Sequence, residues 1–307
     1  MQSLSLRRRC NLASIFDAHV HVWTPDQLSY PLAPGFDATD LWLPSFTPDD
    51  HEAIAGEPLP MNLVQMTWYG LDHSYILDLI ASDPARFTGT GTVPAICDVS
   101  LPRPDRAMLR LAEGGIRAFR LRGHAAQPVR EHATERWLAH EGYDYMFACA
   151  AEHGLVLSFL CAPSDLSEID RMCTRHPEAP VVLDHCGGVR VRDTTIIDAD
   201  LRSLCALSEK PSVYVKFGPV HGLATGATGA ATTPISATLP LLRAIVAAYG
   251  ASRVMWESDL GGPVLLQNGA LGFRSCLDLV REEAEFLNSE QREQILGGTA
   301  RRLLWST

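Results

Sequence analysis

The sequence predicts an α/β fold, a single (β/α)8 TIM barrel. Eight short apolar runs alternate with longer amphipathic ones, a pattern typical of right-handed strand–helix–strand units around a parallel sheet. A doubly wound open sheet is the alternative. No G-x-G-x-x-G follows any of the predicted strands, so the dinucleotide-binding version of that alternative has no support.

The predicted strands are runs rich in Val, Ile, Leu and aromatic residues. In chain order they cover residues 14–23, 61–68, 86–95, 115–123, 155–161, 180–188, 212–219 and 253–262. Helical patterns separate most of them, at residues 71–83, 104–115, 143–154, 164–177, 198–209 and 236–250. After the eighth strand, residues 273–288 and 289–305 predict a helix and a C-terminal helical extension. Residues 1–14 are expected to form a disordered tail, and residues 15–307 one barrel domain.

Two connections are longer than usual for a compact domain. Residues 24–46 form a Pro-rich loop after the first strand, and residues 221–237 form a Gly/Ala/Thr-rich loop after the seventh. Both follow strands. We therefore expect both at the C-terminal face of the barrel, where such enzymes carry their chemistry.

Composition narrows the class of protein. A net charge of −10 without a dense Lys/Arg stripe argues against nucleic acid as a partner. No segment reaches the roughly 18 apolar residues of a membrane span. Eight scattered cysteines without a C-x-x-C pair indicate free thiols in a cytoplasmic protein. The basic run at residues 6–10 leaves a transit peptide as an alternative. Homo-oligomerisation stays open.

Polar side chains stand where hydrophobic strands end. Asp17, His19 and His21 alternate along the first strand, so we expect them to share one face. Further strands end in polar residues: Arg120 and Arg122, His185, Lys216, and Asp259. A barrel brings all of these ends together around one mouth. Buried polar groups need partners, which makes this convergence a candidate active site.

The segments "FDAHVHVW", "LVQMTWYGLDHSYILD", "GIRAFRLRG", "VVLDHCGG", "VYVKFG", "VMWESDLGGP" and "ILGGTARRLL" together resemble the amidohydrolase superfamily. They are most similar to its branch of lactone hydrolases, which includes fuconolactonase-like and 2-pyrone-4,6-dicarboxylate-lactonase-like enzymes. The resemblance covers roughly residues 15 to 305. It implies that His19 and His21 are the H-x-H pair, that His185 is the histidine ending strand six, and that Asp259 activates the attacking water.

In metal-dependent relatives, the resemblance implies, the H-x-H pair and this aspartate bind a divalent ion with a histidine that ends strand five. Here strand five reads "LVLSFLC", and strand four offers arginines instead of a bridging ligand. Three protein ligands and a water still suffice for zinc. We therefore expect either that no cofactor is required or that one divalent ion is bound by His19, His21 and Asp259. Zinc is the first candidate for this ion.

The remaining roles follow from chemistry. Ester hydrolysis needs a base, which Asp259 can be, and donors to the oxyanion, for which the three histidines are suited. The substrate-binding candidates are Arg120, Arg122, Lys216 and Tyr69. The positive charges of the two arginines and the lysine favour an anionic or polyhydroxylated lactone. Asp17 is expected to orient a histidine. Asp184 is a weaker candidate, and the histidines outside strand ends are expected at the surface: His51, His140, His176 and His221.

The sequence thus predicts a hydrolase acting on a carboxylic ester bond, a lactonase for a small sugar-acid or dicarboxylic, pyrone-type lactone. The alternative is a zinc-dependent decarboxylase of an aromatic or unsaturated carboxylic acid in the same superfamily. A barrel that binds a small ligand without turnover is a third reading, of a different class.

Overall fold

The computed structural model describes residues 15–94, 100–123, 137–225, 233–263 and 269–305. Eight parallel strands lie in the order β1-β2-β3-β4-β5-β6-β9-β11. A parallel bridge between Val20 and Leu260 brings the two ends of this sheet together. The strands are β1 (Asp17–Val20), β2 (Met61–Val64), β3 (Phe87–Gly91), β4 (Ile116–Arg122), β5 (Val156–Leu160), β6 (Val181–Leu183), β9 (Val213–Phe217) and β11 (Val254–Trp256). The predicted (β/α)8 barrel is confirmed.

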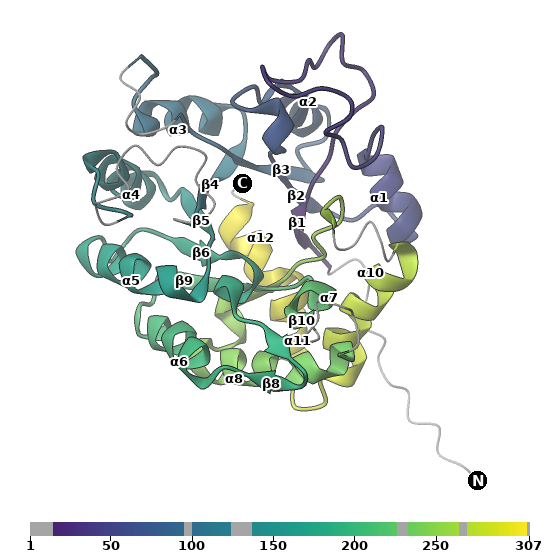
Figure 1. Ribbon diagram of the computed structural model, residues 1–307, viewed down its shortest axis with the longest axis vertical. Helices are drawn as coiled ribbons and strands as arrows, with labels where there is room; N and C mark the ends of the chain where they lie inside the picture. The colour runs from purple at the N-terminus through teal and green to yellow at the C-terminus, as the bar shows by residue number, and fades with distance from the viewer. Residues whose placement is uncertain (1–14, 95–99, 124–136, 226–232, 264–268, 306–307) are drawn as a thin grey trace.

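Helices surround the ring of strands (Figure 1). The longer ones are α1 (Pro48–Ala55), α2 (Ser74–Ser82), α3 (Pro104–Glu113), α4 (Glu141–His153), α5 (Leu166–Arg175), α6 (Asp198–Ala206), α8 (Leu239–Tyr249) and α10 (Gly269–Asp278). The C-terminal extension contains α11 (Ser289–Glu293) and α12 (Thr299–Leu304). Helix α1 belongs to no element anticipated from the sequence. It begins at a capping box in which Thr47 and Asp50 exchange hydrogen bonds.

The loop predicted at residues 221–237 is partly regular. Its first part completes helix α7 (Val220–Leu223) and then forms β10 (Ala224–Thr225). This strand joins β7 (Val191–Arg192) and β8 (Thr195–Ile196) in a small second sheet, which the sequence did not reveal. Its strands are two residues long, too short for a periodic pattern to mark them.

Apolar side chains fill one end of the barrel interior, the end opposite the carboxyl ends of the strands. Ala118, Val156, Val182 and Met255 come from four different strands and form one buried cluster. Ala300 and Leu304 of α12 belong to the same cluster, so α12 closes this end of the barrel. In Figure 1 this helix lies across the centre of the ring of strands. The Thr88 hydroxyl on β3 donates to the Leu304 carbonyl oxygen at 2.8 Å and ties helix to barrel.

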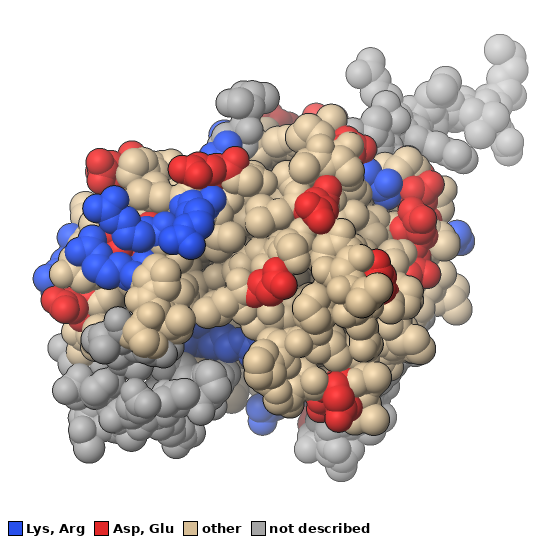
Figure 2. Space-filling model, turned by 90° about the horizontal axis from the view of Figure 1, so that it is seen from above, with Lys and Arg blue, Asp and Glu red and all other residues tan. Residues whose placement is uncertain are grey.

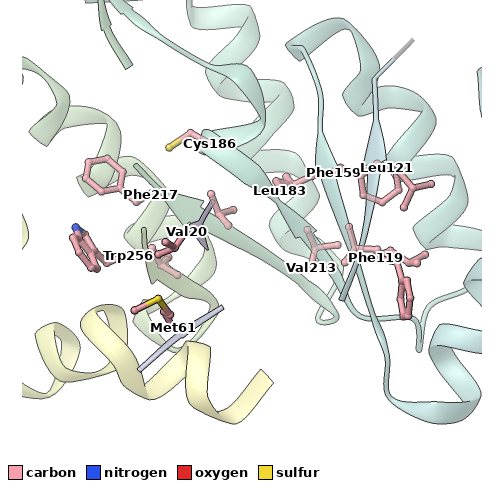
Figure 3. Packing of buried hydrophobic residues seen from close by; sticks show 14 of the residues in the cluster. Val20, Met61, Phe119, Leu121, Phe159, Leu183, Cys186, Val213, Phe217 and Trp256 are labelled. Atoms are coloured by element: carbon pink, nitrogen blue, oxygen red, sulfur yellow. The ribbon is translucent and has the colours of Figure 1, made fainter. Parts of the chain in front are cut away.

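The larger core lies between the strands and the surrounding helices. Phe119, Leu121 and Phe159 project from neighbouring strands β4 and β5 and lie close together, and Phe217 and Trp256 extend the core around β9 and β11 (Figure 3). These outward-facing positions alternate with the inward-facing ones, as a strand period of two requires. Apolar residues on both faces explain why the strands read as continuous hydrophobic runs.

The first long loop, residues 24–46, is anchored at both ends. Trp23 and Phe46 form an antiparallel bridge, with Trp23 N–H donating to Phe46 O at 2.7 Å. The Trp23 ring also packs edge-on against Trp42 and Trp68. Aromatic contacts of this kind stabilise a connection that lacks regular structure of its own.

Within the described ranges, no helix is long and apolar enough to cross a membrane. The predicted tail at residues 1–14 lies outside the described residues. Seen from above, the Lys and Arg side chains gather toward one side of the visible face, while Asp and Glu side chains are scattered over it (Figure 2). The basic residues on this face therefore form a cluster rather than a stripe.

Candidate active site

A polar layer lies directly above the apolar layer of the barrel interior. Two residues beyond Ala118, Val156, Val182 and Met255, the inward-facing side chains become polar. With the matching position on β9, these residues are Arg120, Ser158, Asp184, Lys216 and Glu257, all of them buried. Buried polar side chains must pair with one another. The layer is therefore a hydrogen-bonded platform at the C-terminal end of the strands.

Asp184 is the centre of this platform. Its Oδ1 accepts from Lys216 Nζ at 2.9 Å and from the Ser158 hydroxyl at 2.7 Å, and its Oδ2 lies 3.5 Å from Arg120 Nε. Burial alone would raise the pKa of this carboxyl, but the charges of Lys216 and Arg120 outweigh it and hold the pKa well below its usual range. Asp184 is thus a permanent anion, held by two of the predicted substrate-binding cations.

His19 and His21 lie above this platform. His21 Nδ1 donates to the Val64 carbonyl oxygen at 3.0 Å, which leaves its Nε2 with a lone pair. Nε2 of His19 lies 3.2 Å from Nε2 of His21. Burial, followed by the charge of Lys216, holds the pKa of His19 well below its usual range. Burial, followed by the charge of Arg120, lowers the pKa of His21 to about 3. Both rings are therefore neutral at neutral pH.

His185 follows β6 in a left-handed turn. It has φ +51°, and the next residue, Cys186, has φ +57°. Such values are uncommon for residues other than glycine and concentrate at functional sites. His185 Nδ1 lies 2.7 Å from Glu257 Oε1 and donates to it. Burial lowers the pKa of His185, but the Glu257 carboxylate more than offsets this, and the pKa rises to about 9. His185 is therefore a cation at neutral pH.

Asp259 also has a left-handed backbone, with φ +57°. Its Oδ1 lies 3.5 Å from His21 Nε2 and 3.7 Å from His19 Nε2. Its backbone N–H donates to the His19 carbonyl oxygen at 3.0 Å, which fixes the loop after β11 against β1. Burial raises the pKa of this carboxyl to about 6, although the charge of His185 opposes the rise. A carboxylate with a raised pKa is a better base than an ordinary aspartate.

Gly261 lets this loop approach β1. A Cβ atom at this position would lie 2.1 Å from the carbonyl oxygen of His21, and its φ of +79° also favours glycine. Gly261 is therefore part of the positioning of Asp259.

The donor spacing fits a divalent ion. Tetrahedral zinc with bonds of about 2.1 Å separates neighbouring ligand atoms by about 3.4 Å. The three distances among His19 Nε2, His21 Nε2 and Asp259 Oδ1 are 3.2, 3.5 and 3.7 Å. His19, His185 and Asp259 also offer ligand atoms within 4.8 Å of one another. The residues predicted from the sequence therefore form a set that fits a metal.

The other predicted substrate-binding residues lie around this centre. Arg122 Nη2 donates to the Thr67 hydroxyl, which follows β2. Tyr69 is buried, and its hydroxyl accepts from the backbone N–H of Thr24 at 3.1 Å, at the start of the first long loop. Lys216 is 1% exposed and contacts Asp184 and His19. Arg120 and Lys216 thus line the platform, and Arg122 and Tyr69 lie on or beside the loops.

The expectation that Asp17 shares one face with His19 and His21 is wrong. Three residue steps from Asp17 to Val20 face only two on β2, so β1 carries an extra residue and the strict alternation breaks. Asp17 accepts from the backbone N–H of Ser258 at 3.0 Å and contacts the His51 ring at 3.1 Å. It touches the backbone of His19 rather than its ring. His51, expected at the surface, is fully buried on α1.

The other three histidines expected at the surface, His140, His176 and His221, are half-buried. His176 reaches Asp144 at 2.9 Å, and His140 caps helix α4. None of them belongs to the platform or to the set of His19, His21, His185 and Asp259 that lies above it.

Glu257 was missed in the sequence. Its Oε1 accepts from both the ring and the backbone N–H of His185, and its Oε2 lies 3.1 Å from His19 Nδ1. One carboxylate therefore lies beside two histidines and hydrogen-bonds to His185. The signal was present in "VMWES", because Met255 and Glu257 are two apart and Met255 faces the interior. A charged residue two positions after an interior residue shares its face.

Comparison with known proteins adds to this geometry. The model of an amidohydrolase family matches residues 16–304. This chain belongs to that amidohydrolase family. The predicted resemblance is therefore confirmed, and so is the prediction of a hydrolase at the level of the family. One relative of this amidohydrolase, L-fucono-1,5-lactonase from Burkholderia multivorans, is 27% identical over 298 residues, covering 93% of this chain and 94% of that protein.

Solved structures share the fold of this amidohydrolase. A provisionally assigned 2-pyrone-4,6-dicarboxylic acid hydrolase from Pseudomonas putida matches with a TM-score of 0.70 and 20% identity, covering 95% of this chain and 97% of that one. A Burkholderia multivorans amidohydrolase with bound zinc matches with a TM-score of 0.68 and 21% identity, over 94% and 98%. The 5-carboxyvanillate decarboxylase of Sphingomonas paucimobilis has a TM-score of 0.61 and 14% identity, over 95% and 99%.

Proposed function

We propose that this amidohydrolase opens a small lactone and that Asp259 is the base for the attacking water. The observation that carries the proposal is the place of the Asp259 carboxylate, 3.5 and 3.7 Å from two imidazole nitrogens at the carboxyl ends of the strands. Ester hydrolysis needs a base beside groups that stabilise an oxyanion. Similarity to L-fucono-1,5-lactonase over most of both chains supports a lactone as the substrate.

In the proposed reaction, Asp259 takes a proton from water as the water oxygen bonds to the lactone carbonyl carbon. The carbonyl oxygen becomes an oxyanion, which the cationic His185 stabilises through its Nε2–H. When the ring C–O bond breaks, His185 passes its proton to the leaving oxygen. The proton held by Asp259 then returns to His185 through solvent. The net change is one water added across the ester.

His19, His21 and Asp259 would hold a divalent ion, which supplies Lewis-acid polarisation of the carbonyl when bound. We propose zinc as the first candidate, since these ligand types suit it and their spacing fits it. Arg120 in the platform and Arg122 at the end of β4 are proposed to bind a carboxylate or hydroxyl groups of the substrate, beside Tyr69.

The test is ring opening of a panel of aldonolactones, pyrone acids and muconolactone-type acids, followed through the acid released. We expect turnover of at least one class. Asp259→Asn should lower kcat by about a thousandfold, the range for loss of a general base, while the circular dichroism spectrum stays unchanged. Asp49→Asn, an exposed change on α1, is the matched control. Opening of none of the lactones, or near-normal turnover by Asp259→Asn, would contradict the proposal.

A zinc-dependent decarboxylase is the second candidate. The fit of the ligand spacing to zinc favours it, and arginines suit a carboxylated substrate. The same preparation should be assayed for CO2 release from aromatic and unsaturated carboxylic acids. Release of CO2 that a chelator abolishes, without lactone opening, would favour this candidate over the first.

A further inference from the structure

His19 Nδ1 lies between two groups of opposite hydrogen-bonding character. Lys216 Nζ is 3.3 Å away and can only donate, whereas Glu257 Oε2 is 3.1 Å away and, as a carboxylate oxygen, only accepts. A neutral imidazole carries one N–H. If Nδ1 accepts from Lys216, the proton of His19 is on Nε2, and if Nδ1 donates to Glu257, Nε2 has a free lone pair. The two neighbours thus demand different tautomers.

The positions of the neighbouring nitrogen and oxygen atoms favour the first tautomer. Lys216 Nζ is within hydrogen-bond distance of His19 Nδ1, His19 Nε2 is within hydrogen-bond distance of His21 Nε2, and His21 Nδ1 donates to the Val64 carbonyl oxygen. His21 Nε2 has a lone pair and can only accept. The hydrogen bonds from Lys216 through His19 to His21 therefore all point the same way only when His19 Nε2 carries the proton. Glu257 Oε2 has no hydrogen-bond partner among the described residues, as expected when Nδ1 offers it no proton.

The second tautomer is the one that a metal requires. A nitrogen that carries a proton cannot ligate, so His19 Nε2 binds a divalent ion only after its proton is on Nδ1. There Glu257 Oε2 is placed to accept it. Histidines that ligate metals usually donate their other ring N–H to such a carboxylate. Lys216, Glu257 and His19 are 1%, 0% and 0% exposed, so water cannot replace either partner.

We propose that Lys216 and Glu257 are opposing positioning residues that set the tautomer of His19, and with it the affinity of the site for a divalent ion. Lys216 favours the metal-free form, in which His19 Nε2–H donates to His21 Nε2. Glu257 favours the form in which His19, His21 and Asp259 all present lone pairs. The balance between the effects of Lys216 and Glu257 on His19 therefore determines whether a divalent ion is bound at the site.

The first test needs no substitution. In 15N-histidine-labelled, metal-free protein, the two-bond 15N–1H pattern of His19, assigned by its loss in His19→Gln, should show the Nε2–H tautomer. His21 should show the Nδ1–H tautomer. On adding zinc, His19 should change to Nδ1–H. A metal-free His19 with its proton on Nδ1 would overturn the proposal, whether or not any variant folds.

The second test uses the two lysines of the chain, Lys210 and Lys216. Zinc affinity, measured by competition with a chelating dye, should rise about tenfold in Lys216→Met and fall about tenfold or more in Glu257→Gln, the scale known for groups that support metal ligands. Lys210→Met, at the partly exposed lysine that pairs with Asp170, should leave it unchanged.

A change of net charge alone would also change the zinc affinity of these variants. The measurement that tests the proposal is therefore the tautomer of His19. In metal-free Lys216→Met, His19 should adopt the Nδ1–H form, whereas Lys210→Met should keep Nε2–H. If Lys216→Met binds zinc more tightly but His19 keeps its proton on Nε2, the proposal is wrong. Neither readout needs turnover, so failure here is distinct from failure of the proposed lactonase activity.

Discussion

Asp259 and His185 have pKa values pushed apart by their surroundings. Burial raises the pKa of Asp259 to about 6, and Glu257 overcomes the effect of burial on His185 and raises its pKa to about 9. A pair of groups shifted in this way has its acid and base roles assigned by environment. Between these values the carboxyl is an anion and the imidazole is a cation, which are the forms that the proposed reaction uses.

A bell-shaped pH profile follows at this scale. Without added metal, kcat/KM should fall as pH drops through about 6, because Asp259 gains a proton and stops being a base. It should also fall as pH rises through about 9, because His185 loses the proton it donates. The measurement is kcat/KM from pH 4 to 11 for a lactone that the enzyme opens.

Glu257→Gln separates the two limbs. Removing this carboxylate should move the alkaline limb to lower pH, since Glu257 is what raises the pKa of His185. The acidic limb should persist, because burial is the main cause of the raised pKa of Asp259. An alkaline limb that stays in place would show that His185 is not the proton donor.

Single residues also show where sequence reasoning stops. His19, His21 and Asp259 could be placed together because they stand at strand ends with a recognisable spacing. Glu257 was missed because a glutamate next to "SD" was interpreted as part of the same turn, although its spacing from Met255 already indicated a shared face. The structure adds that its side chain is fully buried and lies between two histidines.

At the scale of elements, the extra residue in β1 divides its polar side chains. His19 and His21 turn to the mouth, and Asp17 instead joins β1 to the turn after β11 and to helix α1. Figure 1 shows α1 on the outside of the barrel, beside α10. The alternating spacing could not reveal this, since a bulge depends on how β1 pairs with β2 and leaves no mark in the run itself. The same holds for His51, whose partner is 34 residues away.

Asp17→Ala should therefore damage the closure of the barrel. It leaves the Ser258 N–H and the His51 ring without an acceptor in a buried place. We expect a loss of about 3 kcal/mol in the free energy of unfolding, since each buried unpaired donor costs about 1–3 kcal/mol. Urea unfolding measures it, and the exposed change Asp49→Ala is the control. A loss below about 1 kcal/mol would show that water or movement of α1 replaces the carboxylate.

Strand order and helix order could be predicted because each strand–helix unit is local and strongly patterned. The ends of strands were less predictable. Residues 180–188 were expected to be one strand, yet β6 ends at Leu183 and a left-handed turn follows. Gly187 and Gly188 favour this turn, but His185 and Cys186 also adopt the left-handed conformation, which local preferences do not predict. The contacts of His185 with Glu257 support it there.

For the whole molecule, the barrel separates stability from chemistry along its axis. Apolar side chains and α12 fill one end, and the polar platform with its histidines occupies the other. In barrels of this type, the end that carries the amino termini of the strands serves stability and the opposite end serves catalysis. The C-terminal extension, predicted only as helix, is therefore part of the barrel core rather than an appendage.

Leu304→Ala tests this separation. Leu304 is 1% exposed and packs inside the lower end of the barrel with Ala300 and Met255. Its truncation should lower the free energy of unfolding by about 2–4 kcal/mol, the range for buried leucine. The neighbouring Leu303 is only partly buried, so Leu303→Ala is the matched control, with an expected loss of about 1 kcal/mol or less.

At a temperature where both variants are folded, kcat and KM of Leu304→Ala should stay within about twofold of the unchanged protein, because the cavity opens below the apolar layer and the polar platform keeps its contacts. Thermal unfolding followed by circular dichroism gives the stability, and initial rates of lactone opening give the kinetics. A large fall in kcat without loss of stability would mean that α12 positions the platform directly, and that the two ends of the barrel are coupled.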